Sequence, residues 1–224
     1  MKRSFIREIL ESIDENTISF AGGLPSENLF PKEDLKTAAV KIFDNPKAFQ
    51  YGLSNGIPEL REKIASRYTK EGFPTAKENI LITTGSQQAM YILAKFYESK
   101  DITIEEPSYL GAMNIFRLNH LKMHGIKLEK DGINIKDFKE SFKNTKLTYL
   151  IPDFQNPSAT TYCDEKRKEI AKIVSEENGI LIEDSPYSEL FFDKKNISIS
   201  SKIPKNSFHL GSFSKTLVPS LRIG

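Results

Sequence analysis

The chain has 224 residues, of which 38% are hydrophobic and 28% charged, a composition typical of a folded protein rather than a disordered one. The 32 lysines and arginines nearly balance 30 aspartates and glutamates, which argues against a protein held to nucleic acid by bulk positive charge. No apolar run approaches the roughly 20 residues of a membrane helix, and one cysteine, Cys163, excludes a disulfide framework and a cysteine-rich zinc site. We therefore expect a cytoplasmic α/β protein.

The first part of the chain shows helical signals separated by turns. Apolar residues recur at helical intervals over residues 4–13, and prolines open two further predicted helices, over residues 31–43 and 57–68. The pair Asn45-Pro46 lies between these last two helices and marks a boundary.

From residue 79 onward, short apolar runs alternate with helical segments. Strands are predicted at residues 80–82, 102–104, 147–151, 180–182 and 208–210, and helices at residues 87–97, 110–121, 135–142 and 164–178. Strands that alternate with helices of this length form βαβ units, so the sequence predicts a doubly wound, mainly parallel sheet. In such a sheet, ligands bind beyond the carboxyl ends of the strands.

Small and polar residues follow the predicted strands. Gly85, Ser86 and Gln87 come after the first strand and open a helix, where free backbone N–H groups can hold a phosphate, although small residues also simply turn corners. The later strands are followed by a tyrosine, an asparagine, an aspartate, a lysine and an arginine, which are Tyr109, Asn156, Asp184, Lys215 and Arg222. A purely structural sheet does not need five such groups at one edge, so we expect a functional site there.

These motifs resemble those of the aminotransferases of fold type I, which depend on pyridoxal 5'-phosphate (PLP). Gly211-Ser212-Phe213-Ser214-Lys215, with Arg222 seven residues later, resembles the lysine motif of that family. Phe154-Gln155-Asn156-Pro157 and Glu183-Asp184-Ser185-Pro186-Tyr187 also match, in the family's order. The opening Phe20-Ala21-Gly22-Gly23-Leu24-Pro25 is similar to the class I/II branch that contains 2-aminoadipate and aromatic amino acid aminotransferases.

The resemblance implies a role for each residue around the PLP ring. Lys215 would hold the cofactor as an aldimine and move the proton in the reaction. Asp184 would keep the ring nitrogen protonated, and Asn156 and Tyr187 would bond the ring hydroxyl. Tyr109 would stack on the ring. The implied catalytic residues are thus Lys215, Asp184 and Tyr187.

The resemblance also implies a phosphate site, a substrate site and a dimer. The phosphate would be bound by residues rich in N–H and O–H donors, namely Gly85, Ser86, Gln87, Ser212, Ser214 and Arg222. Tyr51 would reach the phosphate of a second subunit, so a homodimer is implied. Gly22 and Gly23, together with Asn156, would lie near the substrate. No metal is expected.

The implied fold is the large domain of a PLP-dependent transferase, incomplete at its C-terminal end. Residues 1–45 would be an N-terminal arm and part of the small domain, and residues 46–224 the PLP-binding large domain, truncated after the lysine motif. The implied reaction transfers an amino group from an L-amino acid to a 2-oxo acid. Two alternatives stay open: an inactive or cofactor-binding fragment, which a separately encoded C-terminal piece could complete, and a PLP-dependent lyase.

Other function classes fit less well. Ser212 and Lys215 form a Ser-x-x-Lys motif, but no Lys-Thr-Gly element follows it in the chain. His120 and His124 stand four residues apart without the glutamate of a zinc protease. A PLP-fold transcription regulator would carry a helix-turn-helix domain ahead of the fold, whereas the fold is predicted to begin near residue 1. Finally, Ala159 stands where the family usually has glycine, so a positive φ there would cost about 1 kcal/mol.

Overall fold

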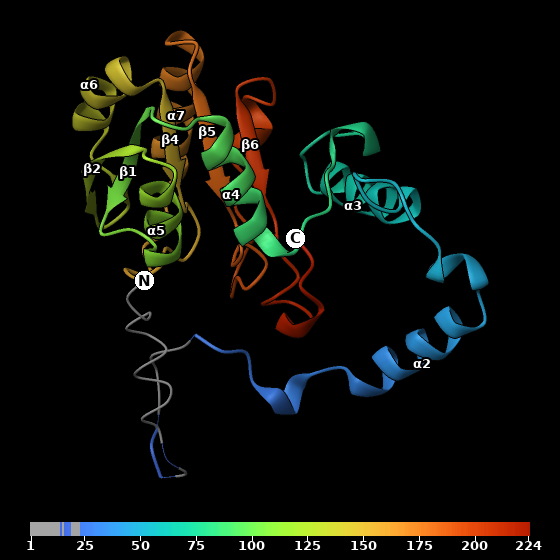
Figure 1. Cartoon of the computed structure of the whole chain (residues 1–224). Coiled ribbons are helices and arrows are strands. Elements are labelled where there is room, and N and C mark those ends of the chain that lie inside the picture. Colours follow the sequence, from blue (N-terminus) through green and yellow to red (C-terminus); the bar gives the residue numbers. More distant parts are fainter. Residues whose placement is uncertain (1–13, 15, 19–22) are drawn as a thin grey trace. The chain divides into compact units, whose positions relative to one another are not determined.

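The computed structural model describes residues 14, 16–18 and 23–224, and the chain divides into two units, residues 1–45 and 46–224. In the first unit, helix α2 (Lys32–Phe43) follows Pro31, close to the predicted bounds (Figure 1). A single 3-10 turn, η1 (Glu27–Leu29), precedes it. The helix predicted over residues 4–13 lies outside the described residues.

The second unit is built on a six-stranded sheet with the order β3-β2-β1-β4-β5-β6 (Figure 1). Five strands are parallel: β1 (Asp101–Glu106), β2 (Lys122–Glu129), β4 (Leu147–Leu150), β5 (Ile180–Asp184) and β6 (Ser207–Leu210). The short β3 (Gly132–Ile133) pairs antiparallel with β2. From the pair β1–β4 at the centre, the chain adds strands outward in both directions, β2 and β3 on one side and β5 and β6 on the other. This confirms the predicted doubly wound, mainly parallel sheet. Its topological switch point lies between β1 and β4.

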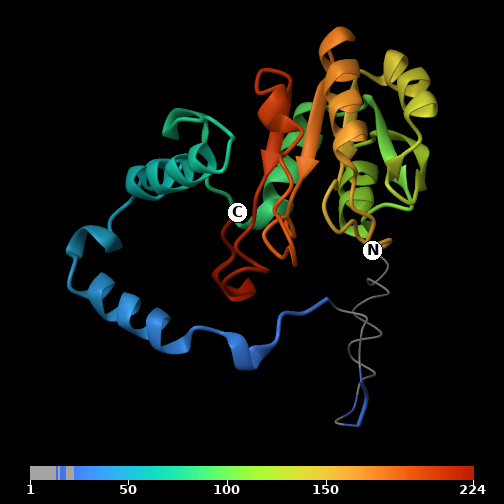
Figure 2. The ribbon, with the colours of Figure 1, turned by 180° about the vertical axis from the view of Figure 1, so that it is seen from behind.

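Helices pack on both faces of the sheet (Figures 1 and 2). They are α4 (Gly85–Phe96) and α5 (Leu110–Leu118) on one face, and α6 (Ile135–Thr145) and α7 (Asp164–Glu176) on the other. A further helix, α3 (Pro58–Lys70), precedes the sheet in the chain. All five helices begin within two residues of their predicted starts. The apolar residues whose spacing predicts each helix are also the residues that form its buried face.

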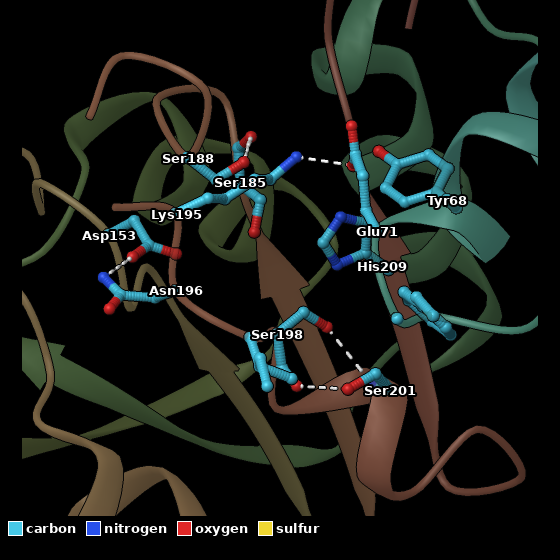
Figure 3. A pocket seen from close by; sticks show the side chains of 13 residues that line it. Tyr68, Glu71, Asp153, Ser185, Ser188, Lys195, Asn196, Ser198, Ser201 and His209 are labelled. Carbon is cyan, nitrogen blue, oxygen red and sulfur yellow. Dashed lines mark hydrogen bonds and ion pairs between the residues drawn. The ribbon is translucent and has the colours of Figure 1, made fainter. Parts of the chain in front are cut away.

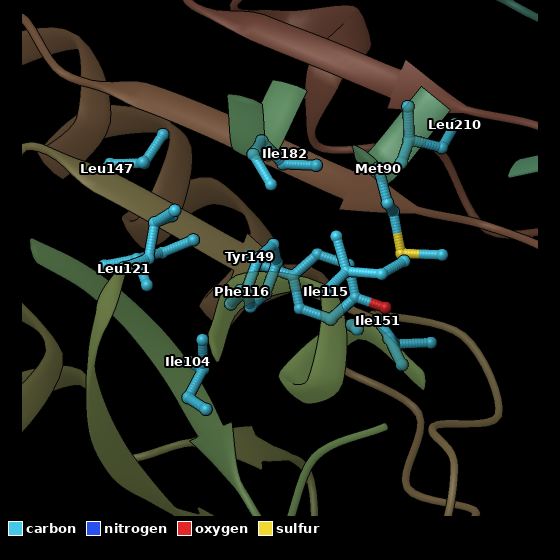
Figure 4. Close-up of a cluster of buried hydrophobic side chains, with 13 residues drawn as sticks. Met90, Ile104, Ile115, Phe116, Leu121, Leu147, Tyr149, Ile151, Ile182 and Leu210 are labelled. Atoms are coloured by element: carbon cyan, nitrogen blue, oxygen red, sulfur yellow. The ribbon is translucent and has the colours of Figure 1, made fainter. Parts of the chain in front are cut away.

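The sheet separates two hydrophobic cores. One contains Met90 and Phe116 from the helices, packed against Tyr149 and Ile182 of the strands (Figure 4). The other contains, among others, Phe138, Phe142 and Ile170 from the helices, packed against Leu150 and Leu181. Neighbouring residues of one strand, such as Ile182 and Leu181, therefore serve opposite cores, as the two-residue period of a strand requires.

The prediction of a strand at residues 80–82 is wrong. The Ile82 N–H donates to the Asn55 carbonyl at 3.1 Å. Thr83, just beyond the segment, exchanges two hydrogen bonds with Gly224: its N–H donates to the Gly224 carbonyl at 2.8 Å and its carbonyl accepts from the Gly224 N–H at 3.1 Å. A cavity of about 670 Å³ is lined by both this segment and β6. Since a ladder needs a neighbouring strand about 4.8 Å away, the segment has no strand among the described residues with which to form one.

The strands β2 and β3 are absent from the sequence predictions. In β2 the residues alternate irregularly between charged and apolar, and only Ile126 is fully buried. Gly125 interrupts the pattern further. The pairing of β2 with β1 over six residues, and not its own composition, makes it a strand.

A buried ion pair ties α7 to the loop after β4. Arg167 is completely buried, and its Nη2 lies 2.6 Å from Oδ1 of Asp153. The guanidinium also donates to the carbonyl oxygens of Pro152 (2.8 Å) and Tyr162 (2.9 Å). Asn196 donates to the same Asp153 oxygen at 2.9 Å. This loop leads directly to Asn156, so the ion pair holds in place the loop that carries this residue of the predicted site.

We predict that Arg167→Ala lowers the free energy of unfolding by about 3–5 kcal/mol, because it leaves the Asp153 carboxylate buried without its cation. The measurement is chemical denaturation followed by circular dichroism. Lys168→Ala, at the exposed neighbouring position of the same helix, is the matched control and should change stability little. Equal stabilities of the two variants would show that the ion pair does not anchor this loop.

Candidate functional site

The carboxyl ends of the parallel strands bring the predicted ring-binding residues to one edge of the sheet. Tyr109 follows β1 and is the N-terminal flanking residue of α5, Asn156 follows β4, and Asp184 is the last residue of β5. Lys215 follows β6 by five residues. Because β1, β4, β5 and β6 are neighbours in this order, these groups line one continuous edge that begins at the switch point.

Asp184 is a buried carboxylate with only one of its oxygens paired. Its side chain is 2% exposed, and the hydroxyl of Tyr149 donates to Oδ2 at 2.6 Å. The other oxygen, Oδ1, is buried without a hydrogen-bond partner in the described part of the chain. Burial raises the pKa of Asp184 to about 6, against the opposing effects of the Tyr149 bond and the His209 charge. A buried, unpaired carboxylate oxygen is costly, and a cationic N–H donor would satisfy it.

Lys215 and Asn156 both lie close to Tyr187, whose hydroxyl is in turn within reach of the charge of Asp184. The Lys215 ammonium is 5.9 Å from the centroid of the Tyr187 ring, within range of a cation–π contact. The Asn156 amide donates to the Tyr187 hydroxyl at 3.4 Å. Burial lowers the pKa of Lys215, which favours a neutral amine that can act as a nucleophile or a base.

Tyr109 lies close enough to both Asp184 and Arg222 for their charges to act on its hydroxyl. Burial raises the pKa of its hydroxyl most, the charge of Asp184 raises it further, and the charge of Arg222 lowers it. The ring also folds back over Gly111, where an added Cβ would come within 2.5 Å of Tyr109 Cζ. Gly111 therefore permits this ring position, a requirement that the sequence pattern does not reveal.

The residues predicted to bind phosphate gather at the start of α4. Gly85 has a φ of +71°, and a Cβ there would lie 2.8 Å from Nη2 of Arg222, so this arginine sits against the first turn of the helix. The first turn of a helix presents N–H groups that the helix itself does not pair, here those of Ser86 and Gln87. A guanidinium at a helix N-terminus is an arrangement suited to a phosphate dianion.

The hydroxyls of the lysine motif lie in the segment that joins β6 to Arg222. The Ser214 N–H donates to the Ser212 hydroxyl at 3.1 Å, which tightens the turn before Lys215. The Phe213 N–H donates to the Ile223 carbonyl at 3.1 Å and holds the two ends of the segment together. Arg222 itself has a φ of +52°.

The contacts at this edge do not test the roles predicted for Tyr51, Gly22 and Gly23. Tyr51 is fully exposed, and its backbone N–H donates to the Gln50 side chain at 2.8 Å. Gly23 belongs to the unit of residues 1–45, which is described by itself, and Gly22 lies outside the described residues. Their roles stay predictions.

Ala159, in the loop after Asn156, has a φ of +59°. This is the left-handed conformation that glycine adopts freely and alanine does not. The expected strain at Ala159 is therefore present in the loop, which is held by the Ala159 N–H bond to the Gln155 carbonyl at 2.6 Å.

A small cavity of about 30 Å³ is lined, among others, by Ser185 and His209 (Figure 3). His209, on β6, packs edge-to-face against Tyr68 at 5.3 Å between ring centroids. Its charge lowers the pKa of Asp184, so it supports the ionised carboxylate. The sequence pattern does not single out His209 or Tyr149, because both lie inside strands, where a side chain of either type is usually a core residue.

The competing metal and membrane interpretations gain no support. His124 makes a 3.0 Å contact with Asp101 on β1. Within residues 14, 16–18 and 23–224, no three histidine, cysteine or acidic side chains gather as a metal site would require. Over the same residues, no helix has the length and apolar character to span a membrane.

Comparison with known proteins identifies a family. Residues 16–224 match the model of the family described as aminotransferase class I and II. The chain is 32% identical to aromatic-amino-acid aminotransferase 1 of Thermococcus litoralis and 34% identical to 2-aminoadipate transaminase of Thermus thermophilus, in each case over its full length. A less similar relative, 31% identical over 94% of the chain, is a helix-turn-helix-type transcriptional regulator of Staphylococcus aureus, of which it spans 49%.

Solved structures agree with this identification. The structure of a Pyrococcus horikoshii kynurenine aminotransferase, determined with PMP, superposes with a TM-score of 0.90 at 33% identity, covering all of this chain and 59% of that one. The chain spans only 57% and 58% of the two aminotransferase relatives named above. With a family match over nearly its whole length, the chain belongs to the class I and II aminotransferases.

Proposed function

We propose that this chain carries the cofactor-binding half of a PLP-dependent aminotransferase, which transfers an amino group from an L-amino acid to a 2-oxo acid. The observation that carries the proposal is the unpaired, buried Oδ1 of Asp184 at the sheet edge where Lys215 also lies. PLP fits this pair, because its protonated ring nitrogen is the donor that the carboxylate lacks and its aldehyde is the group that an amine captures.

The surrounding residues fit the rest of the cofactor. Asn156 and Tyr187, already joined by a 3.4 Å hydrogen bond, would receive the ring hydroxyl. Tyr109 would lie along the ring, and Arg222 with the first turn of α4 would hold the phosphate. When bound, PLP would supply an electron sink for the electron pair left on the substrate's α-carbon as its proton is removed. The residues of this chain would hold the cofactor in place, and Lys215 Nζ would take up and return the proton.

The proposal extends to the whole protein as follows. Residues 1–45 would form an N-terminal arm and part of a small domain, and residues 46–224 the large domain. Tyr51, exposed here, would reach a phosphate in the second subunit of a homodimer. The relatives are longer than this chain, so further substrate-binding groups would lie in the parts of them that these 224 residues do not span. A location in the cytoplasm stays a prediction.

We predict that the chain mixed with PLP develops the visible absorption band of a cofactor attached to a lysine, and that Lys215→Ala abolishes it. Lys202→Ala, an exposed lysine on the same unit, should leave the band unchanged. A band that persists in Lys215→Ala would refute the assignment of Lys215. A band without any amino-group exchange with added amino acid would favour the cofactor-binding fragment, and release of eliminated product would favour the lyase.

We predict a specific pH dependence for the cofactor-free chain, because the pKa of Asp184 is raised from 3.8 to about 6 in the folded state. Between these two pH values the folded protein binds a proton that the unfolded chain does not. The stability contributed by this group is therefore complete below about pH 4 and falls as the pH rises through 6, by about 3 kcal/mol.

Asp184→Asn provides the reference, because its side chain does not titrate. The free energy of unfolding of the wild type relative to this variant, measured by denaturation at pH 4 and pH 7, should decrease as the pH rises. Saturating PLP should reduce the decrease, since a cationic ring nitrogen favours the ionised carboxylate. A difference that is constant over this pH range would contradict the buried, unpaired state of Asp184.

A further inference from the structure

Glu105 is a second buried carboxylate beneath the candidate site, and the roles assigned so far do not include it. It lies on β1, is 1% exposed, and stands four residues before Tyr109. Burial raises its pKa to about 7, although its hydrogen bonds act in the opposite direction. No described residue forms a salt bridge with it, so these hydrogen bonds provide its stabilisation.

Three donors converge on this carboxylate from the loop after β4 and the segment that follows it. Oε1 accepts from the Ile151 backbone N–H at 2.9 Å and from the Tyr162 hydroxyl at 2.7 Å. Oε2 accepts from the side-chain amide of Gln155 at 3.0 Å. All three groups act as donors, so an ionised carboxylate, which only accepts, is complementary to them. An amide at position 105 would turn one of its own N–H groups toward a donor.

Gln155 connects Glu105 to the rest of the loop after β4, which contains Asn156. Its amide nitrogen also donates to the Pro107 carbonyl at 2.8 Å, and its Oε1 accepts from the N–H (2.9 Å) and the hydroxyl (2.7 Å) of Ser158. Gln155 thus links the turn before Tyr109 to both sides of Asn156. Since these two loops flank the switch point between β1 and β4, this link fixes the spacing across it.

We propose that Glu105 is a positioning residue: through Gln155 it sets the place of Asn156 relative to Tyr109. The inference rests on the proposed function for its consequence, because it assumes that these two residues contact PLP. Its structural part, the anchoring of the loop, is independent of any cofactor. The two parts can therefore be tested separately.

The test compares Glu105→Gln with Glu183→Gln. Glu183 is an equally buried carboxylate on β5 that accepts from the backbone N–H groups of Ile199 (3.1 Å) and Ser200 (2.7 Å), and so anchors a different segment. Its Oε2 also lies 3.6 Å from His209 Nδ1, so Glu183→Gln is the control for hydrogen exchange and not for cofactor binding. Both substitutions should lower stability. Only Glu105→Gln should speed hydrogen exchange at the Ser158 and Ala159 amides of the cofactor-free chain, by about tenfold, and Glu183→Gln should instead speed it at Ile199 and Ser200.

The cofactor provides the second readout, measured at pH 8.5, where Glu105 is ionised. We expect Glu105→Gln to weaken PLP binding by about tenfold and to shift the visible band, because Asn156 no longer holds its place. Gln155→Met cuts the link while leaving the other two donors on Glu105, so it should reproduce both effects, and it serves if Glu105→Gln does not fold. Lys168→Ala, at an exposed position of α7, should bind PLP with the wild-type band.

The outcomes separate the two claims. Wild-type exchange rates at Ser158 and Ala159 in Glu105→Gln, or unchanged PLP affinity and band in Gln155→Met, would overturn the positioning role. If instead the wild-type chain binds no PLP while the exchange result holds, the anchoring stands and the proposed cofactor fails.

Discussion

The structure of the site depends on one electrostatic constraint, a carboxylate held out of water with half of its hydrogen-bonding capacity unused. Asp184 ends β5 inside the sheet, where Tyr149 pairs Oδ2 and nothing in the described residues pairs Oδ1. A protein core normally avoids such a group, because burial without a partner costs free energy. Its presence at the carboxyl edge is understandable if a cationic ligand completes it.

The fold supplies the geometry that this constraint requires. Tyr109, Asn156, Asp184 and Lys215 are far apart in the chain, but each follows a strand, and the four strands are neighbours. Hydrophobic cores on both faces fix the strands, while buried polar contacts fix the loops. The Arg167–Asp153 pair and the Glu105–Gln155 contact both act on the loop after β4. Rigid placement of this loop is what allows a single asparagine to be positioned with precision.

Much of this could be predicted from the sequence, for physical reasons that also explain the failures. Four of the five predicted strands form. The apolar runs of β1, β4 and β5 are buried on both faces, whereas β6, with Phe208 40% exposed, forms through its pairing with β5. Residues 80–82 have the same apolar character but lack a neighbouring strand, and β2 has little such character but gains a partner in β1. The composition of a segment therefore does not show whether a neighbouring strand is available to pair with it.

In the site, too, some residues could be predicted from the sequence and others could not. Residue types after strands indicate which groups gather at the edge, so Lys215 and Asp184 could be singled out in advance. The groups that support them could not, since Tyr149, His209 and Glu105 lie within strands and only their three-dimensional contacts distinguish them from packing residues. Gly111 likewise matters only because the Tyr109 ring lies over it.

The most direct test of the account is to locate the cofactor covalently. The chain would be mixed with PLP, reduced with borohydride, digested and mapped by mass spectrometry. The account predicts a phosphopyridoxyl group on Lys215 at about one per chain, with the many exposed lysines labelled only at excess cofactor. Labelling spread over surface lysines with Lys215 unmodified would contradict it.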